Sequence, residues 1–383
     1  MFSFFKKKEY KLTPIQELLL ALLRAQLWLK PVDEIVLPST PEEWDELINL
    51  GYKQTVICFI AKACLRHPNA ESIPSDIKVE FEAVLEENKR IHEHHNAVLI
   101  ELITKFEEQG LHPILLKGQG IAQMYPEPEL RQCGDIDLYF RPYEFEEALS
   151  YMKEIEDEGS NGRLDYKHYD TKYNGTEVEL HRRTVKMPNP WHNKAFQELT
   201  IVKMGNNDYI SINSNYISVP NDEYNIVYSL IHLLHHYEKQ SISLRQICDF
   251  IMLIKHGEKS INFCQLRFDL SRFALLRFWN VILTLMSEYM AISIDVELSV
   301  RKSQACILMH TLMNTGACCF RRLNYTSHSN SIIKKVLSFS RINRKMIECY
   351  KVAGANVIWQ YLLMLRLSVF DFLWRRINKC VLE

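Results

Sequence analysis

The sequence lacks the long apolar runs and the excess charge that mark several protein classes. No stretch of about eighteen residues is both apolar and uncharged, so we expect no transmembrane helix. The nearest candidate, 357–374, is interrupted by Arg366 and Asp371. A formal net charge of −1 argues against a dedicated nucleic-acid binder, although it does not exclude a local basic patch.

Cysteine spacing and the first residues both indicate a reducing compartment. The ten cysteines never occur as Cys-x-x-Cys, and we interpret them as reduced thiols. In MFSFFKKKEYK the positive charges follow a very short apolar run, which is the wrong order for a secretory signal peptide. These features predict a cytoplasmic protein with no integral membrane segment.

The composition is that of an ordinary globular protein, and its patterns fall into three regions. The 383 residues are 47% hydrophobic and 24% charged, enough for a sizeable core. Residues 1–110 and 216–383 show helical periodicity, with start signals such as Thr13-Pro14-Ile15-Gln16. Residues 111–215 contain short strand-like runs. We predict an α+β fold with its core at 111–215, an N-terminal helical region at 1–110 and a C-terminal helical region at 216–383.

The strongest chemical signal is the strand-like segment Asp135-Ile136-Asp137-Leu138. Side chains alternate along a strand, so Asp135 and Asp137 share one face while the apolar pair faces a core. Two adjacent carboxylates repel each other unless a cation lies between them. Mg2+ takes oxygen ligands and shares them with substrate phosphates. The alternative is a solvated strand face, which the poor strand propensity of aspartate disfavours.

A glycine-rich turn precedes this strand. Lys117-Gly118-Gln119-Gly120 follows the apolar run 112–116 and leads into a short helix. Backbone N–H groups in such a turn favour phosphate. We therefore expect Lys117, Gly118, Gly120 and Gly134 to contact a nucleotide, although Lys117 would also suit an ordinary turn.

A hairpin could bring a third carboxylate to the aspartate pair. Asn174-Gly175 predicts a tight turn between strands at 164–173 and 176–183. On the second strand Glu177, Glu179 and His181 share one face. Either glutamate could lie beside the two aspartates.

These motifs resemble a known family. Leu116-Lys117-Gly118, Tyr125-Pro126, Arg131 and Gly134-Asp135-Ile136-Asp137-Leu138 resemble nucleotidyltransferases of the DNA-polymerase-β-like superfamily, and more narrowly a bacterial branch described only as uncharacterised nucleotidyltransferases. The specific part of the resemblance is 114–181. It implies a polymerase-β-like mixed sheet, Glu179 as the third acid with Glu177 as runner-up, and Arg131 as a ligand of triphosphate charge. The alternative for Arg131 is a surface ion pair with Glu127 or Glu129. The gap from Gly118 to Asp135 is longer than is usual in the superfamily, and Lys-Gly replaces Gly-Ser; the branch shares both features.

A histidine-rich helix is predicted from about 221. His232 and either His235 or His236 fall on neighbouring turns, and Arg245 and Asp249 follow at i and i+4 on the next helix. The branch has a similar arrangement, so these residues and His181 are candidates for the wall of a cleft. One alternative is a metal site of the His-Asp phosphohydrolase type. Another is a buried helix whose histidines only form hydrogen bonds.

The resulting hypothesis is transfer of a nucleoside monophosphate from an NTP to an acceptor, with release of pyrophosphate. Asp135, Asp137 and Glu179 are expected to bind Mg2+ (or Mn2+). The acceptor stays open between a small molecule, a sugar phosphate, a protein hydroxyl and RNA. An inactive nucleotide-binding scaffold and a phosphohydrolase centred on His232 and Asp249 are the alternatives. The segment 321–383 carries twelve Lys or Arg against three Asp or Glu, which suits a nucleic-acid contact, a membrane surface or a solvated face.

Overall fold

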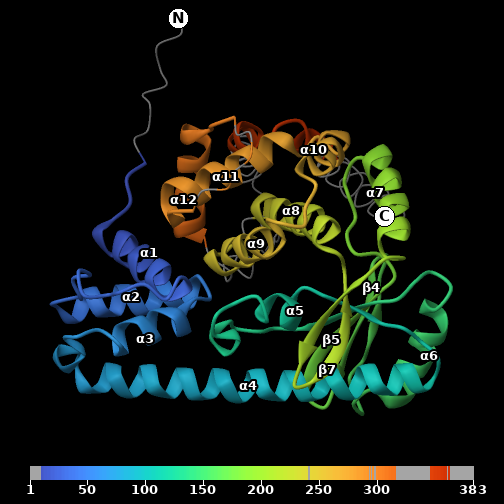
Figure 1. Cartoon of the computed structure of the whole chain (residues 1–383), viewed down its shortest axis with the longest axis horizontal. Coiled ribbons are helices and arrows are strands. Elements are labelled where there is room, and N and C mark those ends of the chain that lie inside the picture. The colour runs from blue at the N-terminus through green and yellow to red at the C-terminus, as the bar shows by residue number, and fades with distance from the viewer. Residues whose placement is uncertain are drawn as a thin grey trace, which may run out of the picture.

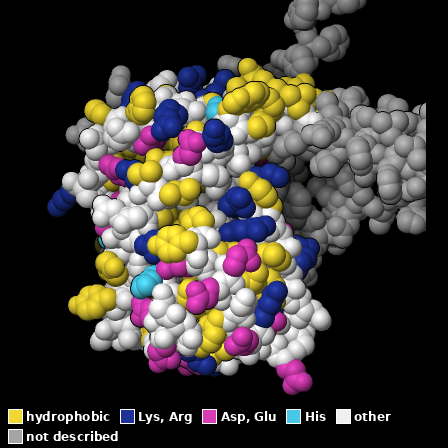
Figure 2. Space-filling view, turned by 90° about the vertical axis from the view of Figure 1, so that its right-hand side faces the viewer, with side chains coloured by type: hydrophobic (Ala, Val, Ile, Leu, Met, Phe, Trp, Pro, Cys, Tyr) yellow, Lys and Arg dark blue, Asp and Glu magenta, His cyan; other side chains and the backbone are white. Residues whose placement is uncertain are grey.

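The computed structural model describes residues 10–239, 242–292, 294, 296, 299–315, 346–359 and 361–362. Most of the basic segment 321–383 lies outside the described residues, and so does the prediction made for it. Within the described part of the chain, no helix has the length and apolar character needed to cross a bilayer. On the face shown in Figure 2, acidic and basic side chains are interspersed, in keeping with the small net charge.

Four helices build the N-terminal region: α1 (Pro14–Leu27), α2 (Pro41–Lys53), α3 (Ile57–Leu65) and α4 (Ser75–Glu108). Thr13 and Thr40 form capping boxes with proline in the first helical turn, so the start signal predicted at Thr13 is confirmed. The 34-residue α4 runs along the length of the molecule at the bottom of Figure 1. It packs against α3 near its beginning and against the sheet near its end, and so joins the helical region to the sheet.

A mixed five-stranded sheet follows, with strand order β1-β2-β5-β4-β3. Its strands are β1 (Ile114–Leu116), β2 (Ile136–Tyr139), β3 (Arg163–Leu164), β4 (His168–Tyr173) and β5 (Thr176–His181). β2 pairs in parallel with β5, and the remaining pairs are antiparallel. The chain crosses from β2 toward the hairpin through α6 (Phe145–Ile155). The predicted α+β class is confirmed, and the parallel pair brings the Asp-x-Asp strand beside the second hairpin strand.

One face of the sheet is covered by α4 and α6. Ile136 and Leu138 are buried there as predicted, together with Phe106 of α4, Phe140 and Phe145. Because side chains alternate along β2, Asp137 lies on the opposite face. The apolar core on one side therefore fixes which face of the sheet carries the acids.

Two elements of the middle region were not predicted. They are α7 (Pro190–Lys203) and the hairpin β6 (Asp208–Ile212)–β7 (Asn215–Val219). Asn213 and Ser214 at the tip of this hairpin both have positive φ, which suits a two-residue turn. β7 lies beside β1, so the hairpin extends the wall of the core next to the sheet.

The C-terminal region is helical: α8 (Asp222–Lys239), α9 (Leu244–Gly257), α10 (Phe263–Arg272), α11 (Leu276–Met290) and α12 (Lys302–Thr315). These helices fill the top of Figure 1. α9 packs against the short α5 (Gly118–Ala122), and α11 packs against α1. Buried residues of both helical regions, such as Leu19 and Phe250, belong to one apolar core. This core holds α8 and α9 over the acidic face of the sheet.

Candidate functional site

Three carboxylates meet where β2 runs parallel to β5. The register pairs Asp137 with Glu179, so both side chains lie on the sheet face opposite the α4–α6 core. Asp135 immediately precedes β2. Ligand oxygens of the three acids lie within 4.8 Å of one another.

The other glutamate of β5 is not part of this group. The Glu177 side chain is 60% exposed and forms an ion pair with Lys172 at 2.9 Å. The geometry thus brings Glu179, and not Glu177, to the aspartates, while the catalytic role of Glu179 stays a prediction.

Asp137 is the most enclosed of the three acids. Its Oδ1 accepts a hydrogen bond from His181 Nε2 at 2.8 Å and lies 3.0 Å from Lys117 Nζ. Its Oδ2 is buried and has no hydrogen-bond partner among the described residues. A buried carboxylate oxygen without a partner is costly, so this atom favours a ligand that the chain itself does not supply.

The charges of the group shift one another's ionisation. Repulsion by Asp137 raises the pKa of Asp135, and burial adds to the shift. Burial alone would also raise the pKa of Asp137, but the Lys117 ammonium and the hydrogen bond from His181 outweigh it and lower the pKa. Asp137 is therefore the firmly ionised member of the pair, and Asp135 is the one under electrostatic strain.

Two histidines surround the third acid. His168 Nδ1 and His181 Nε2 each lie 3.0 Å from Glu179 Oε2. Burial opposes ionisation of Glu179, but the close approach of His168 and His181 more than compensates and lowers its pKa. A glutamate with a lowered pKa is a good metal ligand and a weak base.

The turn before α5 has a strained backbone. Lys117 has φ +42° and ψ −142°, a conformation that costs a non-glycine residue about 1–3 kcal/mol. Gly118 follows with φ +46°, and a Cβ there would lie 3.3 Å from the Asp135 carbonyl oxygen. The ion pair with Asp137 holds Lys117 in this geometry, which presses the turn against the acidic strand.

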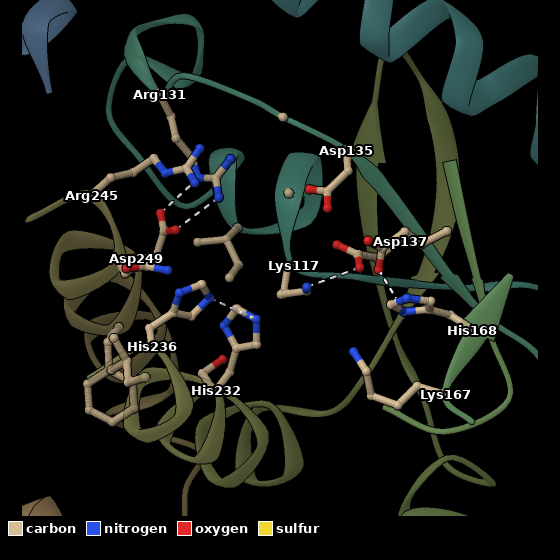
Figure 3. Close-up of a pocket in the computed structure, with 18 residues that line it drawn as sticks. Lys117, Arg131, Asp135, Asp137, Lys167, His168, His232, His236, Arg245 and Asp249 are labelled. Atoms are coloured by element: carbon tan, nitrogen blue, oxygen red, sulfur yellow. Dashed lines mark hydrogen bonds and ion pairs between the residues drawn. The ribbon is translucent and has the colours of Figure 1, made fainter. Parts of the chain in front are cut away.

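A cavity of about 300 Å³ separates the carboxylates from α8 and α9. Figure 3 shows Lys117, Asp135 and Asp137 on one side and His232 and Arg245 on the other. Of the residues predicted to contact nucleotide, four line the cavity: Lys117, Gly118, Arg131 and Gly134.

Gly120 does not line this cavity. A Cβ at Gly120 would meet the side chains of Leu115 and Val219 at 3.5 Å. The glycine therefore allows α5 to pack closely against β1 and β7, and the structure places it away from the predicted nucleotide contacts.

Arg131 is engaged by a carboxylate and is not open to solvent. Its Nε and Nη2 donate to Asp249 Oδ1 and Oδ2 at 2.8 and 2.9 Å, and Tyr125 Oη donates to Asp249 Oδ1 at 2.7 Å. Arg131 is only 4% exposed. Burial opposes its charge, but Asp249 outweighs burial and raises the pKa of Arg131. This geometry supports a structural ion pair, and the predicted phosphate contact of Arg131 is untested.

Arg245 lies beside this pair without an ion-pair partner among the described residues. Its Nη1 donates to the Gln132 carbonyl at 2.6 Å, and its buried Nε has no partner in the described chain. Burial, followed by the charge of Arg131, lowers the pKa of Arg245. Two adjacent guanidinium groups facing one carboxylate leave an excess positive charge at this end of the cavity.

The histidines of α8 line two adjoining cavities. His232 and His236 are one turn apart, with their Nε2 atoms 3.3 Å from each other, and both line the first cavity. His235 lines only the second cavity described below. The metal-ligand groups found among the described residues contain none of the three, and Asp249 is paired with Arg131. The geometry gives the rival phosphohydrolase site no support.

Lys167 and His168 line the cavity but were not predicted as site residues. A two-residue turn at Asn174-Gly175 pairs Tyr173 with Thr176, and counting outward pairs His168 with His181. That signal was present in the sequence. Lys167 precedes β4 and has no ion pair within the described ranges; Figure 3 shows its ammonium group directed into the cavity.

A second cavity of about 400 Å³ adjoins the first. The two share Lys117, Lys167, His232 and His236. The walls found only in the second cavity include His181, Lys186 and Tyr166. It therefore approaches the acids from the β5 side, while the first cavity approaches them from the turn and α9.

A family comparison agrees with the site's composition. The sequence model of a family of uncharacterised nucleotidyltransferases matches residues 40–291, well over half of the chain. The chain belongs to this family, as the motif at 114–141 predicted.

Other comparisons add little. No curated protein matches the chain. One solved structure that matches is the crystal structure of an antigenic nucleotidyltransferase-like protein from Paracoccidioides brasiliensis, with 14% identity over 52% of this chain and 94% of that one, and a TM-score of 0.31. A TM-score this low does not establish a shared fold.

Proposed function

We propose that this chain is a metal-dependent nucleotidyltransferase with a polymerase-β-like core, which moves a nucleoside monophosphate from an NTP to an acceptor. The observation that carries the proposal is the group formed by Asp135, Asp137 and Glu179 at the parallel β2–β5 pair. Membership of a nucleotidyltransferase family supports the general chemistry. Arg245, which has no ion-pair partner in the described part of the chain, lies across the cavity, and its positive charge suits a triphosphate.

The donor set of the three acids fits Mg2+ (or Mn2+). All donors are carboxylate oxygens, which hard divalent cations prefer. The buried Asp137 Oδ2 lacks a hydrogen-bond partner in the described chain, which is expected of an oxygen that binds a cation. When bound, such ions neutralise charge on the transferring phosphoryl group and make the attacking hydroxyl more acidic.

The chain's own residues would prepare the site for this reaction. The contacts from Lys117 and His181 fix the orientation of Asp137. The lowered pKa of Glu179 favours a role as ligand over a role as proton acceptor. Arg245 and Lys167 would contact the triphosphate from opposite sides of the cavity.

The second cavity is the proposed entrance for the acceptor. It reaches the acids past His181, so an acceptor hydroxyl there would approach from the side of Glu179. In the balanced reaction the acceptor oxygen forms a bond to the α-phosphorus, the bond from the α-phosphorus to the bridging oxygen breaks, and pyrophosphate leaves. The acceptor's proton passes to solvent or buffer. We also propose a cytoplasmic setting, where NTPs are available.

A label-transfer experiment tests the proposal. The purified chain is incubated with Mg2+, a lysate of its host and each NTP labelled with 32P at the α- or γ-phosphate. Nucleotidyl transfer predicts acceptor labelling from α-labelled NTP only, which Asp137→Asn should abolish and Glu177→Gln should leave intact. Labelling from γ-labelled NTP alone would indicate a kinase instead. The inactive scaffold predicts NTP binding with no transfer from either position.

A further inference from the structure

Glu179 belongs to a second cluster of donors, which contains nitrogen. The Nδ1 of His168 and the Nε2 of His181 both lie 3.0 Å from Glu179 Oε2, and one donor atom from each of the three residues falls within 4.8 Å of the others. The two rings are almost perpendicular, at 88°, with centroids 4.9 Å apart. Two imidazole nitrogens and a carboxylate oxygen therefore converge on one small volume from adjacent strands.

The second ring nitrogen of each histidine also lies near an oxygen atom. His181 Nδ1 donates to the Arg183 carbonyl oxygen at 3.3 Å, and His168 Nε2 lies 2.8 Å from Asp170 Oδ1 in a close contact that lacks hydrogen-bond geometry. Histidines that bind metals usually donate their second ring nitrogen to a carboxylate or a backbone carbonyl, which fixes the tautomer and turns the lone pair toward the metal, and Asp170 and Arg183 are the groups placed for this role. The backing groups here leave His168 Nδ1 and His181 Nε2 as the nitrogens that face Glu179.

The facing nitrogen of His168 lacks a hydrogen-bond partner in the described chain, and that of His181 is crowded by two carboxylates. His168 is 8% exposed, yet its Nδ1 has no hydrogen-bond partner among the described residues, because its contact with Glu179 is close but poorly directed. His181 Nε2 faces two carboxylate oxygens, of Glu179 and Asp137, at 3.0 and 2.8 Å. Two carboxylates around one ring nitrogen favour a positive centre there, which a metal ion would provide in place of the imidazole proton.

We propose that His168, His181 and Glu179 form a binding site for a divalent transition metal, which shares Glu179 with the all-oxygen magnesium group but adds two imidazole nitrogens. Imidazole donors suit Zn2+, Cu2+ or Ni2+, whereas carboxylate and water oxygens suit Mg2+ and Mn2+. Three protein ligands leave coordination positions for water or substrate. His168 and Glu179 line the first cavity and His181 lines the second, so those positions can be reached from both. The inference does not rest on nucleotidyl transfer, because metal binding is measured directly.

Cobalt titration of the metal-free full chain tests the site. Co2+ bound to imidazole in a site of low coordination number gives visible absorption bands. We expect a single Co2+ per chain with such bands, displaced by equimolar Zn2+ and unaffected by excess Mg2+. Loss of an outer partner of a metal ligand costs on the order of 10–100-fold in affinity. Asp170→Asn should weaken Co2+ binding by a factor in that range, and His168→Gln should weaken it by more.

Three controls make the result decisive. His232→Gln changes another histidine that lines both cavities and should keep the Co2+ spectrum. Asp135→Asn should keep the spectrum while it weakens Mg·NTP binding, which separates this site from the proposed function. Circular dichroism checks folding, and Asp170→Asn serves if His168→Gln does not fold. The proposal is overturned if no visible band appears, if Mg2+ displaces Co2+ equally well, or if His232→Gln weakens binding as much as the Asp170 and His168 variants do.

Discussion

Asp249→Asn should strongly destabilise the fold, because it leaves the buried positive charge of Arg131 without its counter-ion. The side chains of Arg131 and Asp249 are 5% and 12% exposed, and two hydrogen bonds of 2.8 and 2.9 Å join them. Removing one partner of a buried ion pair costs about 3–5 kcal/mol. Asparagine has nearly the shape of aspartate, so no cavity term is added. We expect the free energy of unfolding to fall by about 3–5 kcal/mol.

Denaturant unfolding at pH 7 measures this loss, with the slope against denaturant expected to stay constant. Glu177→Gln is the matched control, because it breaks the Lys172–Glu177 pair, whose side chains are 49% and 60% exposed. Exposed pairs contribute about 0–1 kcal/mol. The reasoning fails if Asp249→Asn is no more destabilising than the control.

Three further changes test separate parts of the account. Glu179→Gln should keep NTP binding but lose transfer, while Glu177→Gln should resemble wild type in a label-transfer assay; the opposite pattern would make Glu177 the third acid. His232→Gln should flatten the dependence of stability on pH below 6.5. Burial lowers the pKa of His232 below that ordinary value, so the unfolded chain binds a proton more readily than the folded chain does. The free energy of unfolding of wild type therefore falls by up to about 1.4 kcal/mol per pH unit as the pH is lowered. If denaturant unfolding from pH 7 to 5 gave wild type and variant the same dependence of stability on pH, this prediction would be wrong. Gly118→Ala should lower the free energy of unfolding by about 1–2 kcal/mol because φ is positive. It should also weaken NTP binding by displacing Asp135. Unchanged stability and an unchanged NTP titration would show that the turn does not contribute to the site.

The local features of the site were predictable, because they depend on strand alternation and turn chemistry. Alternation placed Asp135 and Asp137 on one face, and the Asn174-Gly175 turn fixed the hairpin register. The choice of Glu179 over Glu177 needed the family resemblance, because both lie on the same face of an isolated strand. Only the parallel pairing with β2 distinguishes them.

Long-range partners were not predictable from one sequence. Arg131 and Asp249 are 118 positions apart, and no local pattern reveals that they form an ion pair. The strained backbone of Lys117 is likewise a product of tertiary contacts. His236, by contrast, lies four residues after His232 and shares its helix face, so helical geometry alone favoured it over His235 as the neighbour of His232.

The central claim is that the acids on β2 and β5 bind the metal-bound triphosphate of a nucleotide. Equilibrium titration of Asp137→Asn with Mg2+ and a non-hydrolysable NTP analogue tests it most directly, because Asp137 carries the buried oxygen without a partner in the described chain. We predict that Mg2+-dependent binding is lost while circular dichroism shows an intact fold. Binding of the Mg·NTP analogue to Asp137→Asn with wild-type affinity would contradict the account.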